Sequence, residues 1–426
     1  MLFLSGTSDP APHAKQLLSV KEQQEDFVFW RKKLEKRHPN LYLYTPKATM
    51  DAFLDSLYRS IDHPQTSLAF LNVLTGIYPR LNDGHTFFLP HDQDIAWYNA
   101  NKKFLPFDIT LREGKLFVLR NCTSDTTIRP GTEITTINSV PAWLVIDTLV
   151  RRQVRDGNNT AYAEWIIDTW FRQYYSFSFG HPDSFRLALC LNGDFTIRTC
   201  NALSKDSISF YRTRNYGAAA SEKGVELQTD SKRNKAILTI RSFDDDVLKL
   251  SGQKFQTELP SLMQQIIKGN FSSLILDLRN NQGGNPANGK LLLSYLLDSA
   301  FYLVWKGPSS GLTSPQKQTY AGKVICLVNG GSFSVTGMVA ACLSRHNRCT
   351  FIGEETGGNN TVISGSARSF HLPNSKIYCE VSSKSWVLSP EENKGTGTIP
   401  SRIVHPEQAD IISKTDRQLF YALMLP

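Results

Sequence analysis

The sequence predicts an α/β protein whose largest sheet is mainly parallel. From about residue 235 onward, strand-like and helix-like patterns alternate along the chain. Residues 274–278 form a run, apolar except for Asp277, that is typical of a strand buried on both faces of a parallel sheet. Residues 324–328 form a second such run, and a helical pattern follows it from about Ser334 to residue 343. The loops after these strands are the first places to look for a functional site.

The 426 residues exceed the size of one ordinary core, and their patterns divide the chain into three predicted regions. Residues 1–102 show helical spacing of apolar side chains. Residues 103–202 carry strand-like runs, and residues 203–426 hold the alternating α/β pattern. Within the middle region, Pro130 and Gly131 lead into a strand and then a helix, which resembles part of a PDZ domain. That resemblance implies a PDZ-like, β-rich insertion.

Composition excludes several classes of protein. With 41% hydrophobic and 20% charged residues, the chain is globular, and no window is apolar enough for an integral membrane span. The net charge of +8 arises from 47 basic and 39 acidic residues, a modest imbalance that favours solubility. The basic groups at residues 31–33 and 36–37 lie among acidic residues on a helix-like segment, so we expect no nucleic-acid partner.

The seven cysteines form no C-x-x-C pair, so neither a metal site nor any other cofactor is expected from them. Cys190 and Cys200 flank a hairpin turn at residues 192–194 and are candidates for one disulfide in an oxidising compartment. The first four residues are apolar but follow no basic segment, so they do not form an intact signal peptide. The compartment stays open at this point.

Ser334 is the first candidate for chemistry. It is expected at the start of a helix, after a strand and a turn of small residues, where the helix dipole favours a developing negative charge. The alternative is that Ser334 only caps the helix, as serines often do. The spacing of an α/β-hydrolase elbow is absent, because Ser332 and Thr336 occupy the positions where that motif has glycines.

A second candidate is the turn after the first apolar strand, where Gly283 and Gly284 permit close approach of a ligand to backbone N–H groups. Such donors stabilise an oxyanion by roughly 3 kcal/mol each. A dinucleotide site would need a different glycine spacing and a later acidic residue. Asp277 and Arg279, beneath this turn, are expected to form a structural pair.

Three segments in the same order, residues 276–284, 328–334 and 351–358, resemble the catalytic core of S41 peptidases. The resemblance is strong from residue 235 to 426 and extends more loosely to residues 38–42 and 83–86. It implies a ClpP/crotonase-like α/β core and a serine peptidase that needs no cofactor and acts on peptides or proteins. It also implies a location in the periplasm, in the cell envelope or outside the cell.

The resemblance also assigns roles to residues. Ser334 is the expected nucleophile, the backbone N–H groups of Gly284 and Val335 form the oxyanion hole, and Gly283 and Gly358 contact substrate. An extended peptide is expected to add as a strand to an exposed edge within residues 104–149 and to be guided to the cleft.

One departure from the family pattern decides the expected base. Where the tail-specific branch has a catalytic lysine, this chain has Asn359, whose amide cannot accept a proton at neutral pH. The chain therefore resembles the branch with a Ser-His-Glu triad. His85 lies within residues 83–86, one of the segments that resemble the family, and is the expected base. Glu392 is the expected orienting acid. Its rivals are Glu391, Asp83, Glu354, Glu355 or no acid at all.

Two other functions stay open from the sequence. The chain could be a catalytically silent relative that binds a peptide or an apolar ligand in the same cleft, or an esterase with the same nucleophile. The substrate sequence, the need for a free C-terminus and the oligomeric state are not predicted.

Overall fold

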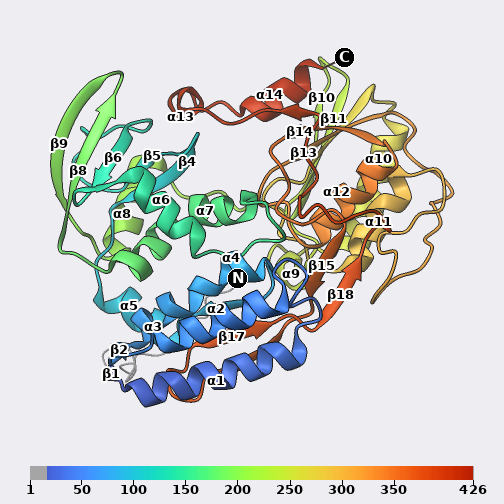
Figure 1. Cartoon of the computed structure of the whole chain (residues 1–426). Coiled ribbons are helices and arrows are strands. Elements are labelled where there is room, and N and C mark those ends of the chain that lie inside the picture. Colours follow the sequence, from blue (N-terminus) through green and yellow to red (C-terminus); the bar gives the residue numbers. More distant parts are fainter. Residues whose placement is uncertain (1–16, 426) are drawn as a thin grey trace. The chain divides into compact units, whose positions relative to one another are not determined.

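The computed structural model describes residues 17–425, which form two compact units (Figure 1). Unit 1 comprises Ile166–Ala219, Ser364–Ser383 and the described part of Met1–Val154. Unit 2 comprises Arg155–Trp165, Ala220–Ile363 and the described part of Lys384–Pro426. Both units are therefore built from segments that are distant in the sequence.

Unit 2 contains a six-stranded sheet in the order β10-β11-β12-β13-β14-β19. Its strands are β10 (Val225–Asp230), β11 (Lys235–Ile240), β12 (Ser273–Asp277), β13 (Lys323–Val328), β14 (Cys349–Gly353) and β19 (Arg402–Ile403). Every neighbouring pair is parallel except β10 and β11. This confirms the predicted α/β fold with a mainly parallel sheet.

Helices cover both faces of this sheet. Alternate residues of β12 and β13 join two separate apolar clusters, as the period of two requires: Leu274 and Cys326 lie in one, Ile275 and Ile325 in the other. The first cluster contains side chains of α9 (Asp245–Leu250), α10 (Phe255–Lys268), α11 (Pro286–Leu296) and α12 (Val335–Arg345). The second contains side chains of α14 (Arg417–Met424), which follows the short helix α13 (Gln408–Ser413).

Unit 1 begins with the predicted helical region. Its helices are α1 (Val20–Arg37), α2 (Lys47–Arg59), α3 (Ser67–Leu74), the 3-10 turn η1 (Thr75–Ile77), α4 (Tyr78–Leu81) and α5 (Asp92–Asn101). Two small sheets accompany them, β1 (Leu17–Leu18) with β2 (Gln65–Thr66), and β16 (Arg368–His371) with β17 (Tyr378–Val381) and β3 (Phe87–Leu89). The antiparallel pairing of β17 with β3 brings the segment Ser364–Ser383 into this unit.

A larger antiparallel sheet of unit 1 has the order β4-β5-β6-β8-β9, with β7 on β6. Its strands are β4 (Phe107–Arg112), β5 (Lys115–Asn121), β6 (Glu133–Ile137), β7 (Val140–Pro141), β8 (Ser184–Leu191) and β9 (Asp194–Asn201). The same part of the chain forms the helices α6 (Ala142–Arg151), α7 (Ala161–Phe179) and α8 (Lys205–Tyr216). The remaining strands, β15 (Val362–Gly365) and β18 (Lys384–Val387), stand where the chain passes between the units.

The suggested disulfide between Cys190 and Cys200 is wrong. Both thiols are free, because the register of β8 and β9 places Cys190 opposite Phe195 and Cys200 opposite Phe185. The two cysteines are thus held apart along the hairpin.

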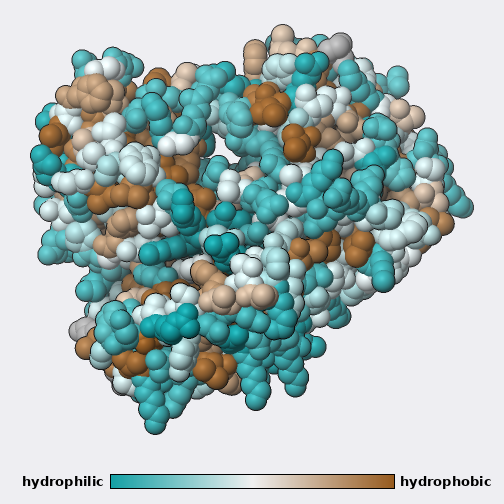
Figure 2. Space-filling model, viewed as in Figure 1, coloured by the Kyte–Doolittle hydropathy of each residue, from teal (hydrophilic) through white to brown (hydrophobic). Residues whose placement is uncertain are grey.

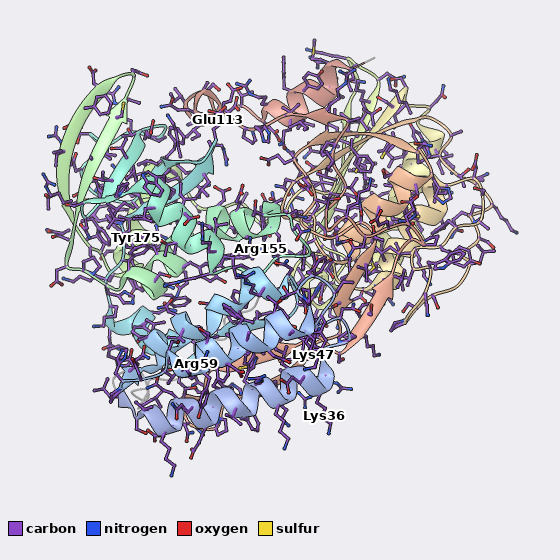
Figure 3. All side chains as sticks on the ribbon, in the orientation of Figure 1. Lys36, Lys47, Arg59, Glu113, Arg155 and Tyr175 are labelled. Carbon is purple, nitrogen blue, oxygen red and sulfur yellow. The ribbon has the colours of Figure 1, made fainter. Side chains whose placement is uncertain are left out.

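The surface is mostly hydrophilic on the face shown in Figure 2. The basic residues Lys36, Lys47 and Arg59 lie on α1 and α2 (Figure 3). Arg31 of the predicted basic group is bonded to the carboxylates of Glu35 and Asp55, so this surface is not uniformly cationic. Within residues 17–425, no helix is long and apolar enough to cross a membrane.

Candidate active site

Ser334 lies in the turn that joins β13 to α12, called here the Ser334 turn (residues 329–334). Its backbone has φ 54° and ψ −123°, a region that L residues avoid and glycine tolerates. Strain of this kind costs of order 1–3 kcal/mol and is concentrated at functional sites. Ser334 is also the one partly exposed residue in the otherwise buried run 330–343. The turn therefore places Ser334 at the carboxyl edge of the sheet, just after β13.

Helix capping does not explain Ser334. Its side chain makes no capping hydrogen bond to α12. By contrast, Ser332 is fully buried, and its hydroxyl donates to the carbonyl of Leu278 (2.9 Å) and accepts from the N–H of Asn329 (3.1 Å). Ser332 is thus a structural residue of the turn.

The turn after β12 that contains Gly283 and Gly284, called here the glycine turn, supplies backbone N–H donors. Among the residues that the structure describes, no hydrogen bond uses the N–H of Gly284 or that of Val335, the first residue of α12. Gly284 is exposed, whereas the N–H of Gly283 is occupied by the side chain of Asn281 (2.9 Å). Two backbone donors thus remain available for an anionic oxygen, and the one on Val335 also lies at the positive end of a helix.

Two further glycines pack directly against the Ser334 turn. A Cβ built on Gly283 would lie 2.7 Å from the N of Val335 and 2.8 Å from the Cβ of Ser334. A Cβ on Gly358 would lie 3.2 Å from the N of Ser334. The structure therefore brings Gly283, Gly358, Val335 and Ser334 together within unit 2.

The predicted structural pair beneath the glycine turn is present. The guanidinium of Arg279 donates to both carboxylate oxygens of Asp277 (2.9 and 2.6 Å) and also to Asp416 of the segment before α14. These contacts anchor the base of the glycine turn and leave Asp277 no role as an exposed acid.

Asn359 is a buried structural residue. Its side-chain oxygen accepts the N–H groups of Thr361 (2.7 Å) and Val362 (3.0 Å). Its amide nitrogen donates to the side chain of Asn393 (2.9 Å), the residue after Glu392. The position that carries a lysine in the tail-specific branch here ties two loops of unit 2 together.

The candidate acids of unit 2 differ in their surroundings. Glu391 and Glu392 are exposed. Glu355 accepts the N–H of Gly397 (2.7 Å), and Glu354 contacts the imidazole of His405 (3.2 Å). Glu354 and Glu355 are therefore already engaged in contacts that stabilise loops.

His85 lies in unit 1, in a turn built around the buried carboxylate of Asp83. That carboxylate accepts from the Nε2 of His38 (2.7 Å), the backbone N–H of His85 (2.9 Å) and the hydroxyl of Thr86 (2.6 Å). Burial acts to raise the pKa of Asp83, but the hydrogen bond and charge of His38 outweigh it and lower that pKa strongly. Burial lowers the pKa of His85, against the opposing effect of the charge on Asp83.

Sequence reasoning gave His38 no role. Its Nδ1 accepts the N–H of Asn40 (3.2 Å), so Nε2 carries the hydrogen that is donated to Asp83. The available signal was the position of His38 at the start of residues 38–42, one of the segments that resemble the family. This histidine fixes the carboxylate that shapes the His85 turn.

Sequence reasoning also missed an aromatic stack. Tyr162, from the segment Arg155–Trp165, stacks face to face on Phe333 with ring centroids 3.8 Å apart, and its hydroxyl contacts Gln282 (3.4 Å). Trp165 donates to the side chain of Asn280 (2.8 Å). This segment therefore packs on both the Ser334 turn and the glycine turn, and no local sequence pattern predicts that contact.

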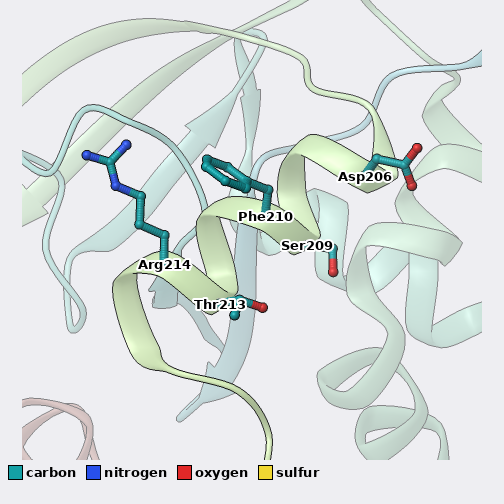
Figure 4. A pocket seen from close by; sticks show the side chains of 5 residues that line it. All are labelled: Asp206, Ser209, Phe210, Thr213 and Arg214. Carbon is teal, nitrogen blue, oxygen red and sulfur yellow. The ribbon is translucent and has the colours of Figure 1, made fainter.

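An open pocket on α8 of unit 1 does not compete for the catalytic role. It is lined by one face of a single helix, as Figure 4 shows, with the residues Asp206, Ser209, Phe210, Thr213 and Arg214. No histidine or backbone anion site is among these residues, so they do not form a nucleophile with its base.

Residues 234–382 match the model of peptidase family S41. A curated relative is the chloroplastic carboxyl-terminal-processing peptidase 3 of Arabidopsis thaliana, 29% identical over 117 residues. That match covers 26% of this chain and 22% of the relative, so the chain matches only about a fifth of that protein's length.

Two solved structures are similar over nearly their whole length. Mature CPAF complexed with lactacystin has a TM-score of 0.68 at 15% identity, and the match covers 95% of this chain and 97% of that one. A putative peptidase from Parabacteroides merdae has a TM-score of 0.51 at 14% identity, with 96% and 98% covered. At such identity these two similarities show a shared fold.

Proposed function

We propose that this chain, whose matches support membership of peptidase family S41 and the class of serine peptidases, hydrolyses peptide bonds through an acyl-enzyme on Ser334. The observation that carries the proposal is the strained, partly exposed Ser334, which is followed by Val335 and is in contact with Gly283, the residue before Gly284. Among the described residues, no hydrogen bond uses the N–H of Val335 or of Gly284. A serine that only capped a helix would need neither feature.

The reaction follows from these groups. The hydroxyl oxygen of Ser334 attacks the scissile carbonyl carbon while His85 takes its proton. The N–H groups of Gly284 and Val335 bind the resulting oxyanion, at roughly 3 kcal/mol per donor. His85 then gives the proton to the leaving amine, and water hydrolyses the ester in a second cycle of the same steps.

A neutral His85 suits this role, since burial lowers its pKa and keeps the imidazole able to accept a proton near pH 7. We assign Glu392 as the orienting acid, with Glu391 as its rival. The carboxylate of Asp83 already accepts three hydrogen bonds from its own turn and His38, which supports a structural role for it.

The matched pair Glu392→Gln and Glu391→Gln tests the acid, because both side chains are exposed and neither change should affect folding. Only Glu392→Gln should lower kcat, by roughly 10⁴ if Glu392 holds the imidazole tautomer. The reverse pattern would transfer the role to Glu391.

The unit 2 sheet is the part of the fold proposed as the ClpP/crotonase-like core, and the β4–β9 sheet of unit 1 as the PDZ-like insertion. One detail of the sequence-based expectation changes. The free edge expected within residues 104–149 is covered, because Asp168 accepts the N–H of Leu111 (2.6 Å) and Arg172 donates to the carbonyls of Leu105 and Phe107. A substrate strand does not add at β4.

A fluorophosphonate probe with a peptide library tests the function. The wild type should be labelled and should cleave peptides, and Ser334→Ala should lose both properties while Ser344→Ala, an exposed serine at the end of α12, keeps them. A wild type without labelling would be a silent binder of peptides or apolar ligands. Labelling with ester but no peptide hydrolysis would make the chain an esterase.

A further inference from the structure

We propose that β9 of unit 1 is the edge at which a second copy of this chain docks, with β9 pairing antiparallel to β9 across a two-fold axis at Thr196. This inference uses unit 1 alone and does not depend on the proposed peptidase activity.

β9 is an unprotected edge strand. It is the last strand of its sheet, and among the described residues it pairs with β8 alone (Figure 1). Seven of its eight residues are exposed, and Cys200 is half-buried. Proteins usually protect such edges with charged side chains, above all lysine, or with proline, a bulge or a short strand; β9 has no lysine, proline or bulge, and its two charged residues, Asp194 and Arg198, have opposite signs. A free edge of this length needs an occupant or it invites aggregation.

The opposite edge of the same sheet shows the contrast. Side chains of α7 bond outward backbone groups at both ends of β4: Asp168 accepts the N–H of Leu111, and Arg172 donates to the carbonyl of Phe107 and to that of Leu105 just before the strand. The sheet therefore has one covered edge and one open edge, and a docking partner has only β9 available.

The hairpin turn decides which backbone groups of β9 face outward. Asn192 (φ 52°) and Gly193 (φ 89°) form a two-residue turn with positive φ at both positions, so Leu191 and Asp194 make the first hydrogen-bonded pair. The pairs alternate from there. The N–H and C=O groups of Phe195, Ile197 and Thr199 accordingly point away from β8.

One register makes the strand complementary to itself. With Thr196 opposite Thr196 of the second copy, Phe195 faces Ile197 and Asp194 faces Arg198, each pair occurring twice. The outward groups of Phe195 and Ile197 then form the hydrogen-bonded pairs, as the ladder requires. A shift by two positions in either direction removes both charged pairs and replaces the two Phe195–Ile197 pairs by one self-pair, of Phe195 or of Ile197.

The side chains involved are free to make these contacts. Phe195 is 77% exposed and Ile197 54%, and both lie on the same face of the strand. Asp194 and Arg198 share the other face, and no ion pair of either side chain is found within residues 17–425, although the pKa of Asp125 is lowered by hydrogen bonds and, in addition, by the charge of Arg198. A passing peptide has no fixed charge pattern, whereas a second copy always supplies the complementary one. The charges therefore favour a second copy.

The expected association is weak. One strand pair with two aromatic–aliphatic contacts buries less than a standard interface, so we expect a dissociation constant in the micromolar range. Sedimentation velocity of the full chain from about 1 to about 100 µM should then show a concentration-dependent dimer.

Charge reversal tests the register. Asp194→Arg and Arg198→Asp each place two like-charged pairs in the interface and should weaken the dimer at least about tenfold. An equal mixture of these two variants should form a heterodimer, because arginines on one copy then face aspartates on the other. The double variant Asp194→Arg/Arg198→Asp should regain the wild-type dissociation constant.

A cross-link tests the axis. Cysteines at Thr196 would form a non-hydrogen-bonded pair with Cα atoms about 4.5 Å apart, within reach of a disulfide. Under mild oxidation Thr196→Cys should give a covalent dimer above the wild-type background, and Thr199→Cys, which faces Gly193 of the other copy, should not. The proposal would be overturned if the wild type stays monomeric to about 100 µM, or if neither charge reversal changes the dissociation constant of the dimer. A monomer whose β9 variants raise KM for long peptides would assign the edge to substrate instead.

Discussion

Replacing Ser334 by glycine should stabilise the protein while it removes the proposed nucleophile. The backbone at Ser334 has φ 54° and ψ −123°, which glycine adopts without a Cβ clash. Ser334→Ala removes the same hydroxyl but keeps the Cβ and with it the strain. The two inactive variants should therefore differ in stability.

The magnitude follows from two opposing terms. Strain of this kind costs about 1–3 kcal/mol, and the extra freedom of glycine in the unfolded chain returns about 0.5–1 kcal/mol. With the middle value of each range, Ser334→Gly should unfold with a free energy about 1 kcal/mol above that of Ser334→Ala. For a unit of roughly 200 residues, this corresponds to a Tm about 2–4 °C higher.

Ser332 is the matched control, since it lies in the same turn without a positive φ. There the order should reverse, with Ser332→Gly less stable than Ser332→Ala. Urea unfolding followed by circular dichroism, together with thermal melts, measures both differences. If Ser334→Gly melts at or below the temperature of Ser334→Ala, the strain argument for this site is refuted.

Three other variants or conditions give further tests. Because burial lowers the pKa of His85 and the base must be neutral, kcat/KM should rise with one ionisation below about pH 6.5 and then stay level; a rate still climbing past pH 9 would exclude a histidine base. Asp83→Asn should lower the free energy of unfolding by about 3–5 kcal/mol at pH 7. The pKa of Asp83 is lowered in the folded state, so this contribution is present above about pH 4 and is lost as pH falls toward the folded-state pKa; equal losses at pH 7 and pH 2 in urea titrations would contradict it. Gly283→Ala should reduce kcat on the order of 10²-fold in peptide hydrolysis, because a Cβ at this φ of 93° would meet Val335 and Ser334. The control Gly114→Ala also has a positive φ, of 71°, but its Cβ would lie in open space, so kcat should not change.

The α/β core of unit 2 could be predicted because its signals are local. The run at residues 324–328 is apolar at every position and that at 274–278 at every position except Asp277, and the structure buries β12 and β13 on both faces. The helix after Ser334 was predicted from its spacing in the same way. Such patterns depend only on neighbouring residues.

Contacts between distant segments could not be predicted in this way. β17 pairs with β3 although almost 290 residues separate them, and Tyr162 stacks on Phe333 from a segment with no distinctive composition. The three predicted regions, 1–102, 103–202 and 203–426, follow composition along the chain, whereas the compact units collect segments by contact. Those domain boundaries, like the location outside the cytoplasm, stay predictions.

Conformation was the other missing information. A serine that caps a helix and a serine in a strained turn look the same in the sequence, and the structure separates them by the φ of Ser334 and by the missing capping hydrogen bond. The cysteine pairing failed on the register of the hairpin, because the residue opposite Cys190 is Phe195, five positions before Cys200. The turn consists of residues 192 and 193 alone, so Leu191 lies opposite Asp194 and Cys190 lies opposite Phe195.

Asn359 shows how one substitution can change what a loop does. A lysine here would need its amine neutral and close to Ser334, but the side chain at this position is buried and turned toward backbone N–H groups. The amide instead bonds to Asn393, next to Glu392, while Gly358, on its other side, packs against the N of Ser334. One short loop therefore links the proposed nucleophile to the segment that carries the proposed acid. If Asn359 stands where the tail-specific branch has its lysine, as the resemblance implies, a catalytic base in this chain has to come from another segment, as the proposal for His85 requires.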